Sequence, residues 1–389
     1  MNTQKHILFI SSWYPNRNNP THGVFNAYMA KAAAKHNRVS VIHVCSDETL
    51  TSNLELVESN DDLIYTITAY YQKVKSKLPF ISQWLKMKRL MKAYEVAYLH
   101  LIEKKGIAQL IQLNVAMPAG IGVLNLSKKY HIPFVLNENW SGYTMEDGNY
   151  KGILLKYFTQ KIVAQAKKIM PTSLYLQEAM LAHGLKGDYE VVPNVVDVHR
   201  FFPKLAPSDG RLKLVHISSL IEREKNVSGI LRAFQQALKQ NSNMELVIIG
   251  EGDNKLELKA LAELLGILAN TKFMGRVVGD ELIQTLQVSN ALIMFSHYET
   301  FCLVIIEALA CGKPVITSNA GAIPSYMNDK LGLMVEKNNE DQLCEAILKL
   351  SANSNQFDAQ YLRAFAEKYS YERVGQQLDE IYKQAILNK

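Results

Sequence analysis

The sequence predicts an α/β protein built from two doubly wound, Rossmann-like parallel sheets. The chain has 389 residues, 48% of them hydrophobic, which is enough for two domains with separate cores. Strand-like and helix-like segments alternate through both halves. Between the halves, residues 198–211 (VHRFFPKLAPSDGR) contain two prolines and one glycine, a composition typical of a linker.

The first half opens with an apolar strand, HILFIS, at residues 6–11. Later runs rich in Val, Ile and Phe are expected to be strands, and segments with apolar residues every three or four positions are expected to be helices. The further expected strands are 39–44, 108–114, 133–138 and 167–173, and the expected helices are 24–36, 80–94 and 119–130.

The second half repeats this alternation. The expected strands are 213–220, 244–250, 271–275, 291–295 and 314–318, and the expected helices are 228–239, 255–265 and 302–311. A final helix at 371–387 has no strand after it, so we expect it to pack back on the first domain. The predicted domains are residues 1–198 and 199–370, followed by the C-terminal helical segment 371–389.

The positive charge of the chain lies in its first half. Residues 1–198 hold 22 Lys and Arg against 15 Asp and Glu, a balance of +7, and residues 199–389 hold 21 against 22, a balance of −1. Residues 63–94 contain seven basic residues and no acid, and the segment 80–94 also has apolar residues at helical spacing. This pattern predicts an amphipathic basic helix.

Two interpretations of this helix stay open. It could lie on an anionic membrane surface through Trp84 and the basic residues Lys86, Lys88, Arg89 and Lys92. It could equally be an ordinary domain helix with a solvated lysine face. Nucleic acid is not an expected partner, because no nucleic-acid-binding motif accompanies the charge.

The remaining composition argues against a membrane-spanning, a secreted or a metal-binding protein. No apolar run reaches the eighteen residues of a membrane span, and the N-terminus reads as a first strand and not as a signal peptide, so we expect a cytoplasmic protein, with peripheral membrane association as a further option. The four cysteines show no CxxC pairing, and no HExxH or DxD motif occurs. We therefore expect no metal and no cofactor.

The segment 297–314 (HYETFCLVIIEALACGKP) is the strongest indicator of function. It reads as a loop after a strand, followed by a helix that begins near Cys302, and the free N–H groups of such a helix suit a diphosphate. Glu307 would lie about 7 to 8 Å along the helix, one nucleoside away, where it could bind ribose hydroxyls. Glu299 would lie on the other side of the phosphates, near a transferred group. Glu307 also interrupts an apolar run, where a charge is costly without a partner.

The first domain offers a second candidate loop at residues 11–23 (SSWYPNRNNPTHG). Gly23 allows a close backbone approach just before a helix. Arg17 and the asparagines of the loop could meet sugar hydroxyls or a phosphate. Two domains of this kind are expected to bind ligands between the carboxyl ends of their sheets.

Taken together and in order, several motifs resemble glycosyltransferase family 4, the retaining enzymes of GT-B fold. The motifs are the Glu299 and Glu307 pair, VPNVVD at 192–197, IIGEGD at 248–253, FMGRV at 273–277 and SNAGAIP at 318–324. The resemblance covers nearly the full chain. It implies a nucleotide-sugar donor bound by the second domain, an acceptor bound by the first, no essential metal, and transfer with retained anomeric configuration.

The resemblance also implies roles for single residues. Glu307 would hold the ribose, Glu299 the donor sugar, and Lys225 would neutralise the diphosphate as the glycosidic bond breaks. The other positions expected to bind the donor, from their local sequence or from the resemblance, are Gly23, Ser219, Arg223, Gly250, Arg276, Val277, Thr300, Phe301, Cys302 and Leu303.

The chain departs from the family pattern at several places. Ser219 stands where an Arg is common, and Arg223 is a possible replacement for that charge. Asn139 occupies the position of a catalytic His, and Asn cannot titrate. Cys302 and Ala322 stand where glycines are usual, which crowds the donor loop.

The leading hypothesis is a retaining, metal-independent transferase that moves a sugar from a UDP- or GDP-sugar to a glycan acceptor, for example a lipid-linked one in surface polysaccharide or glycoconjugate synthesis. A second hypothesis is a protein of the same fold that binds a nucleotide sugar or a partner without turnover, which Ser219 and Asn139 motivate. A third is another GT-B enzyme, such as a sugar-nucleotide epimerase. The sequence does not distinguish the donor base, the sugar or the acceptor.

Overall fold

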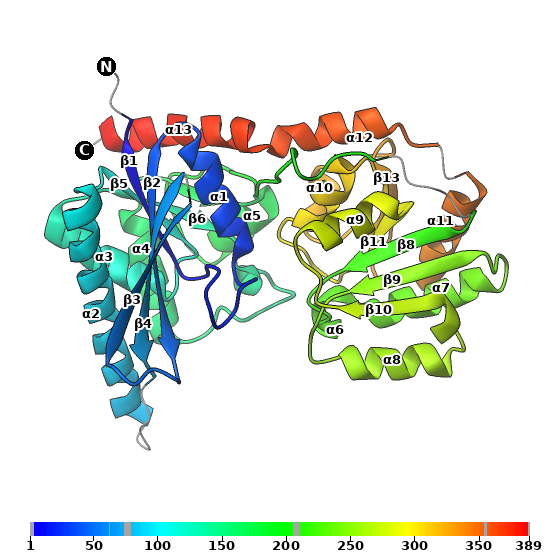
Figure 1. Ribbon diagram of the computed structural model, residues 1–389, viewed down its shortest axis with the longest axis horizontal. Coiled ribbons are helices and arrows are strands. Elements are labelled where there is room, and N and C mark those ends of the chain that lie inside the picture. The colour runs from blue at the N-terminus through cyan, green and yellow to red at the C-terminus, as the bar shows by residue number, and fades with distance from the viewer. Residues whose placement is uncertain (1–3, 62, 74–78, 205–209, 354–355, 388–389) are drawn as a thin grey trace. The chain divides into compact units, whose positions relative to one another are not determined.

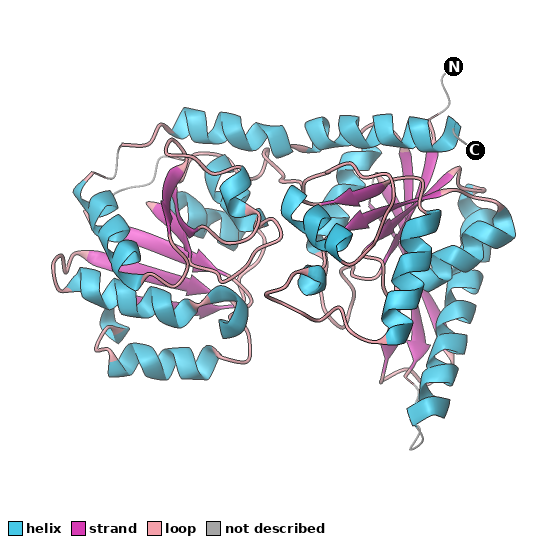
Figure 2. Ribbon diagram, turned by 180° about the vertical axis from the view of Figure 1, so that it is seen from behind, coloured by secondary structure: helices cyan, strands magenta, loops and turns pink. Residues whose placement is uncertain are grey.

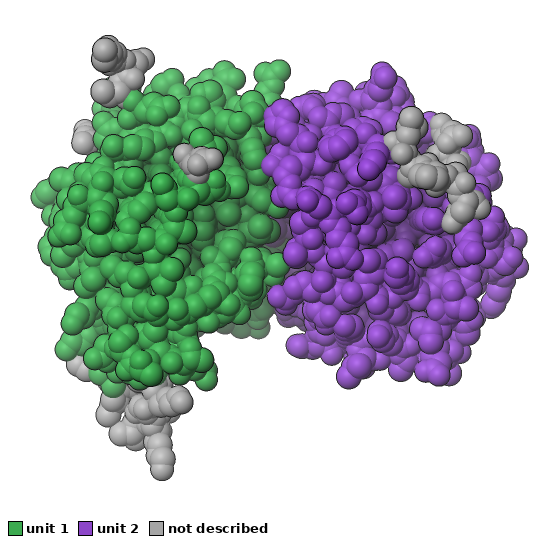
Figure 3. Space-filling model, viewed as in Figure 1, with its two compact units in different colours: residues 1–195, 371–389 green, residues 196–370 purple. Residues whose placement is uncertain are grey.

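The computed structural model describes residues 4–61, 63–73, 79–204, 210–353 and 356–387. The chain forms two compact units, one of Met1–Val195 with Tyr371–Lys389 and the other of Val196–Ser370 (Figures 1 and 3). Each unit contains one sheet with helices on its faces (Figure 2). The predicted class of two α/β domains is confirmed.

The first unit has a seven-stranded sheet in the order β3-β4-β2-β1-β5-β6-β7. Neighbouring strands are parallel except for β3 and β4, which pair antiparallel. The strands are β1 (His6–Ser11), β2 (Arg38–Asp47), β3 (Leu54–Asp61), β4 (Ile64–Gln72), β5 (Leu110–Asn114), β6 (Phe134–Glu138) and β7 (Ile169–Pro171).

Helices cover both faces of this sheet, so both faces of its central strand are apolar. In β1, Leu8 and Ile10 enter one core cluster while Ile7 and Phe9 enter the other, and all four are fully buried. The helices of the unit are α1 (Val24–Ala34), α2 (Pro79–Lys105), α3 (Ala119–Tyr130), α4 (Ile153–Gln165), α5 (Leu174–Ala182) and α13 (Tyr371–Leu387), with a short 3-10 helix η1 (Ser141–Tyr143).

The second unit has a six-stranded parallel sheet in the order β10-β9-β8-β11-β12-β13. The strands are β8 (Leu212–Ile217), β9 (Met244–Ile249), β10 (Thr271–Gly275), β11 (Ala291–Met294), β12 (Val315–Ser318) and β13 (Gly332–Val335). The α-helices are α6 (Glu222–Lys225), α7 (Val227–Leu238), α8 (Lys255–Leu264), α9 (Asp280–Val288), α10 (Leu303–Ala310), α11 (Glu340–Ala352) and α12 (Ala359–Ala366), and the 3-10 helices are η2 (Leu268–Asn270), η3 (Ile323–Ser325) and η4 (Glu367–Tyr369).

Several elements were not predicted from the sequence. β3 is largely exposed and rich in acids, which is typical of an edge strand and gives no alternating apolar pattern. α4 has apolar residues on both its buried and its exposed side, so it lacks the spacing of an amphipathic helix. The other unpredicted elements are β4, β13, α5, α6, α9, α11 and α12.

The C-terminal helix α13 packs against α1 within the first unit. Gly375 makes this close approach possible, because a Cβ atom there would lie 2.3 Å from the carbonyl oxygen of Ala32. Leu378 and Tyr382 of α13 are fully buried. The chain leaves the first unit after Val195, three residues before the expected boundary at 198.

Hydrogen bonds explain this earlier boundary. The N–H of Val196 donates to the carbonyl of Tyr369 at 2.9 Å, and Arg363 Nη2 donates to the carbonyl of Val198 at 2.9 Å. Both partners belong to the second unit. Residues 196–198 are therefore its first residues.

Candidate functional site

The loop between β11 and α10 carries Glu299. It lies at the carboxyl end of a central parallel strand, the edge where α/β sheets bind ligands. Cys302 precedes the helix in a left-handed conformation, with φ of 67°, and α10 begins at Leu303. The first N–H groups of a helix have no partner within the helix. The structure thus places a helix N-terminus beside Glu299, where the sequence predicted it.

Lys225 and Glu299 form an ion pair at this edge. Lys225 Nζ donates to Glu299 Oε1 at 2.8 Å, and Ser296 Oγ donates to the same oxygen at 2.8 Å. The two charged side chains are only 17% and 9% exposed. Burial lowers the pKa of Lys225, but the charge and hydrogen bond of Glu299, together with Cys302 and Glu224, outweigh burial and raise this pKa above its usual value. The ammonium group therefore stays charged.

Backbone contacts hold Lys225 in place. The residue ends α6, and the N–H of His297 donates to the carbonyl of Glu224 at 2.8 Å, which ties α6 to the Glu299 loop. Asn226 follows with φ of 47°, and its side chain caps α7. Glu222 accepts hydrogen bonds from the first N–H groups of α7. The ammonium group is thus fixed by two helices and one loop.

The loop of Glu299 is also held from the side of β12. The N–H of Ala322 donates to the carbonyl of Glu299 at 2.9 Å. A Cβ atom on Gly321 would lie 2.1 Å from that carbonyl oxygen, so a larger residue would push the loop away. Tyr326 Oη donates to the carbonyl of Phe301 at 2.6 Å. The segment SNAGAIP therefore supports the loop through close backbone contact.

The four residues from Thr300 to Leu303 differ in exposure. Phe301 and Cys302 are buried, and burial raises the pKa of the Cys302 thiol well above its usual range. Thr300 and Leu303 are partly exposed. Phe301, Cys302 and Leu303 can therefore offer phosphates mainly their backbone, in line with the role that the family resemblance implies, while the partly exposed Thr300 also carries a hydroxyl.

Glu307 is the fifth residue of α10 and is only 8% exposed. Burial raises the pKa of its carboxyl from 4.5 to about 7. A buried carboxylate is costly unless it accepts hydrogen bonds. Glu307 lies about 6 Å along the axis from Leu303, at ~1.5 Å per residue. Its position suits a ligand with hydroxyl donors one nucleoside away from the helix N-terminus.

The loops after β8 and β9 lie close together. A Cβ atom on Gly250 would lie 1.9 Å from the carbonyl oxygen of Ser218. Ser218 Oγ is 2.7 Å from Nε2 of His216, whose Nδ1 is 2.9 Å from a backbone carbonyl. Burial lowers the pKa of His216 to about 4, so the imidazole is neutral and Nε2 accepts from the serine. Gly250 is therefore required for packing of these loops.

Ser219 and Arg223 are exposed next to these loops. Residues two apart on a helix do not face the same way, and Arg223 and Lys225 follow this rule. Arg223 Nη2 lies 3.8 Å from the Glu224 carboxylate, whereas Lys225 points to Glu299. The structure does not add Arg223 to the ion pair.

The loop after β10 carries Arg276 and Val277. Val277 is buried in the core, so only its backbone can face a ligand, while Arg276 is exposed. Lys255 Nζ donates to Glu251 Oε1 at 2.6 Å, and together with Arg276 it lowers the pKa of Glu251. This loop thus lies beside an ionised carboxylate.

Gly23 belongs to the first unit, whereas the other predicted donor-binding residues belong to the second. A Cβ atom on Gly23 would lie 2.5 Å from the backbone of Trp13, and its φ is 65°. Asn26 Nδ2 donates to the Trp13 carbonyl at 2.7 Å. Gly23 therefore closes the turn before α1 tightly.

Arg17 is engaged in ion pairs within the same loop region. Its guanidinium contacts Asp47 at 2.8 Å and Glu55 at 2.8 Å, and it lies 3.8 Å above the centre of the Tyr70 ring. The hypothesis that Arg17 meets a phosphate would require these contacts to break.

Asn139 follows β6 and is buried. Its backbone N–H donates to Glu138 Oε1 at 2.9 Å, and its Nδ2 donates to Asn137 at 3.1 Å. Glu138 itself was missed by sequence reasoning. A carboxylate that directly follows an apolar strand, in PFVLNE, was the signal that could have found it.

Glu138 is fully buried and accepts four hydrogen bonds. The donors to Oε1 are the N–H groups of Asn139 and Trp140 at 2.9 and 3.0 Å, and the donors to Oε2 are the N–H of Ala116 at 2.9 Å and Tyr143 Oη at 3.1 Å. Burial raises the pKa of Glu138, and these hydrogen bonds oppose the rise. Because all four partners donate, the geometry fits the ionised form. Glu138 joins the loops after β5 and β6 to η1.

The predicted membrane-surface residues lie on α2. Lys86, Lys88 and Lys92 are exposed, whereas Arg89 donates to the carbonyl of Gln72 at 2.7 Å. The side chain of Trp84 lies outside the described residues. From Leu90 onward the apolar side of α2 is buried in the core, together with Tyr94 and Tyr98. That half of the apolar face is not available to a lipid surface.

No group of three or more His, Cys, Asp or Glu side chains in the described ranges is arranged to hold a metal ion. None of the helices in the described part of the chain combines the length and the apolar composition of a bilayer-spanning segment.

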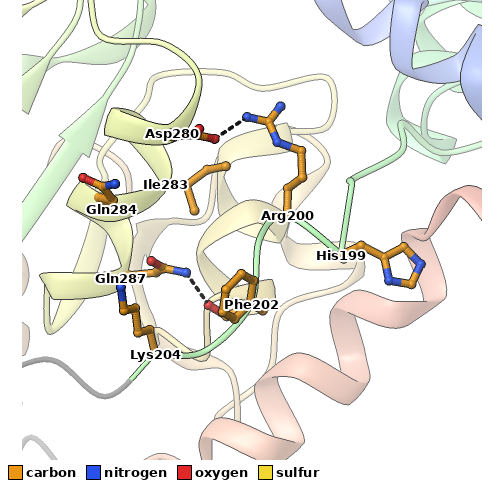
Figure 4. A pocket seen from close by; sticks show the side chains of 8 residues that line it. All are labelled: His199, Arg200, Phe202, Lys204, Asp280, Ile283, Gln284 and Gln287. Carbon is orange, nitrogen blue, oxygen red and sulfur yellow. Dashed lines mark hydrogen bonds and ion pairs between the residues drawn. The ribbon is translucent and has the colours of Figure 1, made fainter.

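A separate pocket of about 320 Å³ lies between α9 and the segment 199–204 (Figure 4). Arg200 contacts Asp280 at 2.8 Å, and Gln287 donates to the carbonyl of Phe202 at 2.9 Å. None of the predicted site residues lines this pocket. We therefore assign it no part in the candidate site.

Comparison with known proteins identifies the second unit. Residues 197–369 match the family model of glycosyl transferases, group 1. This segment is a group 1 glycosyl transferase domain. The family that the motifs predicted is thereby confirmed, and the Lys225, Glu299 and Glu307 positions all lie inside the matched segment.

Curated proteins similar to this chain are also described as glycosyltransferases. The chain is 26% identical over 325 residues to an uncharacterized glycosyltransferase of Methanocaldococcus jannaschii, with 82% of this chain and 87% of that protein covered. It spans only about half the length of other curated relatives, namely 51%, 48% and 56%.

Solved structures show that the chain has the GT-B fold. Sucrose-phosphate synthase from Thermosynechococcus elongatus aligns with a TM-score of 0.77 at 18% identity, over 99% of this chain and 100% of that one. The Anabaena protein HepE, solved with UDP and glucose, aligns with a TM-score of 0.72 at 17% identity, over 97% and 99%. At this level of identity the likeness shows the fold alone.

Proposed function

We propose that the protein transfers a sugar from a nucleotide-sugar donor, bound by the second unit, to a glycan acceptor bound by the first. The observation that carries this proposal is the Lys225 and Glu299 ion pair beside the N-terminus of α10. A fixed cation and free N–H groups form a binding site for a diphosphate. The UDP of the HepE complex is consistent with such a donor.

In the proposed reaction, the bond between the sugar and the diphosphate breaks, and its electron pair stays on the diphosphate oxygen. The acceptor hydroxyl forms the new bond to the sugar, and its proton passes to the leaving diphosphate oxygen. Lys225 and the backbone N–H groups at the start of α10 stabilise the negative charge on the leaving diphosphate. Stabilisation of this charge is the main task of the site.

The two glutamates have separate proposed roles. Glu299 lies before the helix and would accept hydrogen bonds from hydroxyls of the donor sugar. Glu307 would accept hydrogen bonds from the ribose, which would supply the donors that its buried carboxylate lacks from solvent. UDP and GDP carry the same ribose and diphosphate, so this arrangement fits both.

Further parts of the proposal rest on the family resemblance. Transfer would retain the anomeric configuration, and no metal ion would be required, because Lys225 supplies the positive charge. We propose a glycan acceptor that is carried by a lipid, as in surface polysaccharide or glycoconjugate assembly. Asn139 would contact the sugar by hydrogen bonds and would not act as a titrating group.

The proposal is tested by incubating the protein with UDP-, GDP- and ADP-sugars together with polyprenyl-linked or free oligosaccharide acceptors, and by measuring nucleotide release. We expect release with at least one donor and a strong reduction in the variant Glu299→Gln. Glu263→Gln is the matched control, because Glu263 is exposed on α8.

Two outcomes would contradict transfer. Calorimetric binding of a nucleotide sugar without release would identify a binding protein of the same fold. Conversion of the sugar nucleotide without any acceptor would identify an epimerase.

A further inference from the structure

α4 presents an exposed apolar stripe that the core does not use. Ile153, Leu154 and Tyr157 are 87%, 67% and 54% exposed. At 100° per residue, these three side chains fall within one arc of the helix surface. Exposed large apolar residues that gather on one helix face are uncommon on proteins that contact only water. The stripe therefore indicates a binding surface.

The opposite side of α4 is anchored in the first unit. Ile162 and Val163 are fully buried in the core. A Cβ atom on Gly120 of α3 would lie 2.4 Å from Ile162 Cδ1, so the two helices are in close contact. Because this side fixes the rotation of α4, the stripe of Ile153, Leu154 and Tyr157 faces outward in the folded protein.

Lysines flank the stripe. Lys151 precedes α4; on the helical wheel Lys156 lies about 60° to one side of Ile153, and Lys161 lies between Tyr157 and Leu154, one turn further along the helix than Tyr157. All three are exposed. Residues 148–177 contain five lysines and no acidic residue. The start of α4 also has no acid in its first turn, so the helix dipole adds positive potential there.

We propose that this face of α4, made of Lys151, Ile153, Leu154, Lys156, Tyr157 and Lys161, is a docking surface for an anionic lipid bilayer. The apolar side chains would enter the interface, Tyr157 would lie at headgroup level, and the lysine stems would extend along the apolar stripe to lipid phosphates.

A lipid surface fits this face better than a protein partner. Three apolar side chains cover far less than the roughly 800 Å² per partner of a stable protein interface. A bilayer needs only a few inserted side chains when lysines bind its negative surface as well. The uniform positive charge is complementary to anionic headgroups and would repel a second copy of the same face.

The proposal is independent of sugar transfer, because binding is measured without any nucleotide sugar. Flotation with vesicles of phosphatidylcholine and phosphatidylglycerol in a 3:1 ratio is compared with flotation on pure phosphatidylcholine vesicles. We expect the full-length protein to float with the anionic vesicles only, and to be released by high salt.

Two variants test the lysines and the apolar side chains of this face separately. The triple variant Lys151→Gln, Lys156→Gln, Lys161→Gln should lower the partition coefficient on the order of 100-fold, since each lysine near an anionic surface contributes about fivefold. The variant Ile153→Ser, Leu154→Ser should lower it about tenfold or more. The matched control is Leu256→Ser, Leu264→Ser on α8, where both leucines are similarly exposed.

The control should float like the parent protein. Flotation of both α4 variants at the parent level would overturn the proposal, and so would a parent protein that does not bind anionic vesicles. Loss of flotation only in Lys86→Gln, Lys88→Gln, Lys92→Gln would assign the membrane surface to α2 instead. If light scattering shows that the parent protein is a dimer and that the variant Ile153→Ser, Leu154→Ser is a monomer, this face of α4 is a protein interface.

Discussion

The buried carboxylates near the carboxyl ends of the two sheets differ in their hydrogen-bond partners. In the first unit, Glu138 accepts four hydrogen bonds, all from the protein itself. In the second unit, Glu299 is bound by Lys225 and Ser296, and Glu307 is buried with its pKa raised to about 7. The carboxylate of the first unit has its hydrogen-bond donors within the protein, whereas the carboxylates of the second unit carry charge that a ligand would stabilise.

This difference distinguishes a carboxylate with a structural role from carboxylates that can bind a ligand. A carboxylate whose two oxygens already accept four hydrogen bonds fixes loops but has little capacity left for a ligand. A carboxylate kept buried at a cost in stability is retained where it has a task in binding. Under the proposed function, recognition of the donor would fall to Lys225, Glu299 and Glu307, whereas Glu138 holds loops of the first unit together.

The largest expected effect is on turnover, in Lys225→Ala. Loss of the cation removes the main stabilisation of the leaving diphosphate, and we expect kcat to fall roughly 100- to 1,000-fold. Steady-state nucleotide release measures this. The control Lys239→Ala, at the exposed end of α7, should stay within twofold of the parent. A tenfold or smaller loss in Lys225→Ala would remove Lys225 from the reaction and weaken the contrast between the two units.

The next effect is on stability, in Glu138→Gln. The new amide group would face two hydrogen-bond donors, and each donor left without an acceptor costs about 1 to 3 kcal/mol. We expect the free energy of unfolding to fall by about 3 kcal/mol in urea titrations, whereas the exposed control Glu178→Gln changes it by less than about 0.5 kcal/mol. A change below about 1 kcal/mol would mean that Glu138 is not the anchor of its loops.

Glu307 should make stability depend on pH. Its pKa is about 7 in the folded protein and near 4.5 in the unfolded chain, so between these values the folded state holds more protons than the unfolded state. Stability should therefore fall as pH rises from about 4.5 to 7, by roughly 2 to 3 kcal/mol from this group.

Glu307→Gln should remove that loss. At pH 8 we expect the variant to be more stable than the parent by about 2 kcal/mol, with little difference near pH 4.5. Its affinity for UDP or GDP should fall roughly 10- to 100-fold, because charge-assisted hydrogen bonds to the ribose are lost. Denaturation at the two pH values measures the difference in stability, and calorimetry measures the affinity for UDP or GDP. Equal pH profiles of variant and parent would show that Glu307 titrates normally.

The smallest expected effect is that of metal removal. Because Lys225 supplies the positive charge in the proposed reaction, treatment with EDTA should change nucleotide release by less than twofold. A loss of activity that Mg²⁺ or Mn²⁺ restores would show that the second unit needs a metal ion as well as its own cation.

Much of the second unit could be predicted from the sequence. The helix expected near Cys302 begins at Leu303, and the apolar run around Glu307 predicted a buried carboxylate. These predictions succeed because they depend on local signals: an apolar strand, a short loop and a helix with regular spacing. Lys225 was found only through the family motif, since its partner lies 74 residues away along the chain.

Other features depend on contacts that no local pattern shows. The basic helix α2 looked amphipathic, yet Leu90 and Tyr94 on its apolar side are covered by the core. α4 showed no clear helical pattern, because its apolar residues occupy both faces, and only its packing on α3 reveals which of them stay exposed. Glu138 gave a weak signal, because a single carboxylate after a strand does not reveal that its oxygens accept four hydrogen bonds, one of them from Ala116, 22 residues away.

The sequence by itself determined the two α/β domains and the family of the second unit. These properties follow from hydrophobic periodicity and from motifs that are contiguous in the chain. Only the tertiary structure decided that Lys225 reaches Glu299, that Glu138 is saturated and that α4 exposes its apolar stripe. Each of these features depends on which segments of the chain contact one another in the fold. Burial and hydrogen bonding are determined by those contacts.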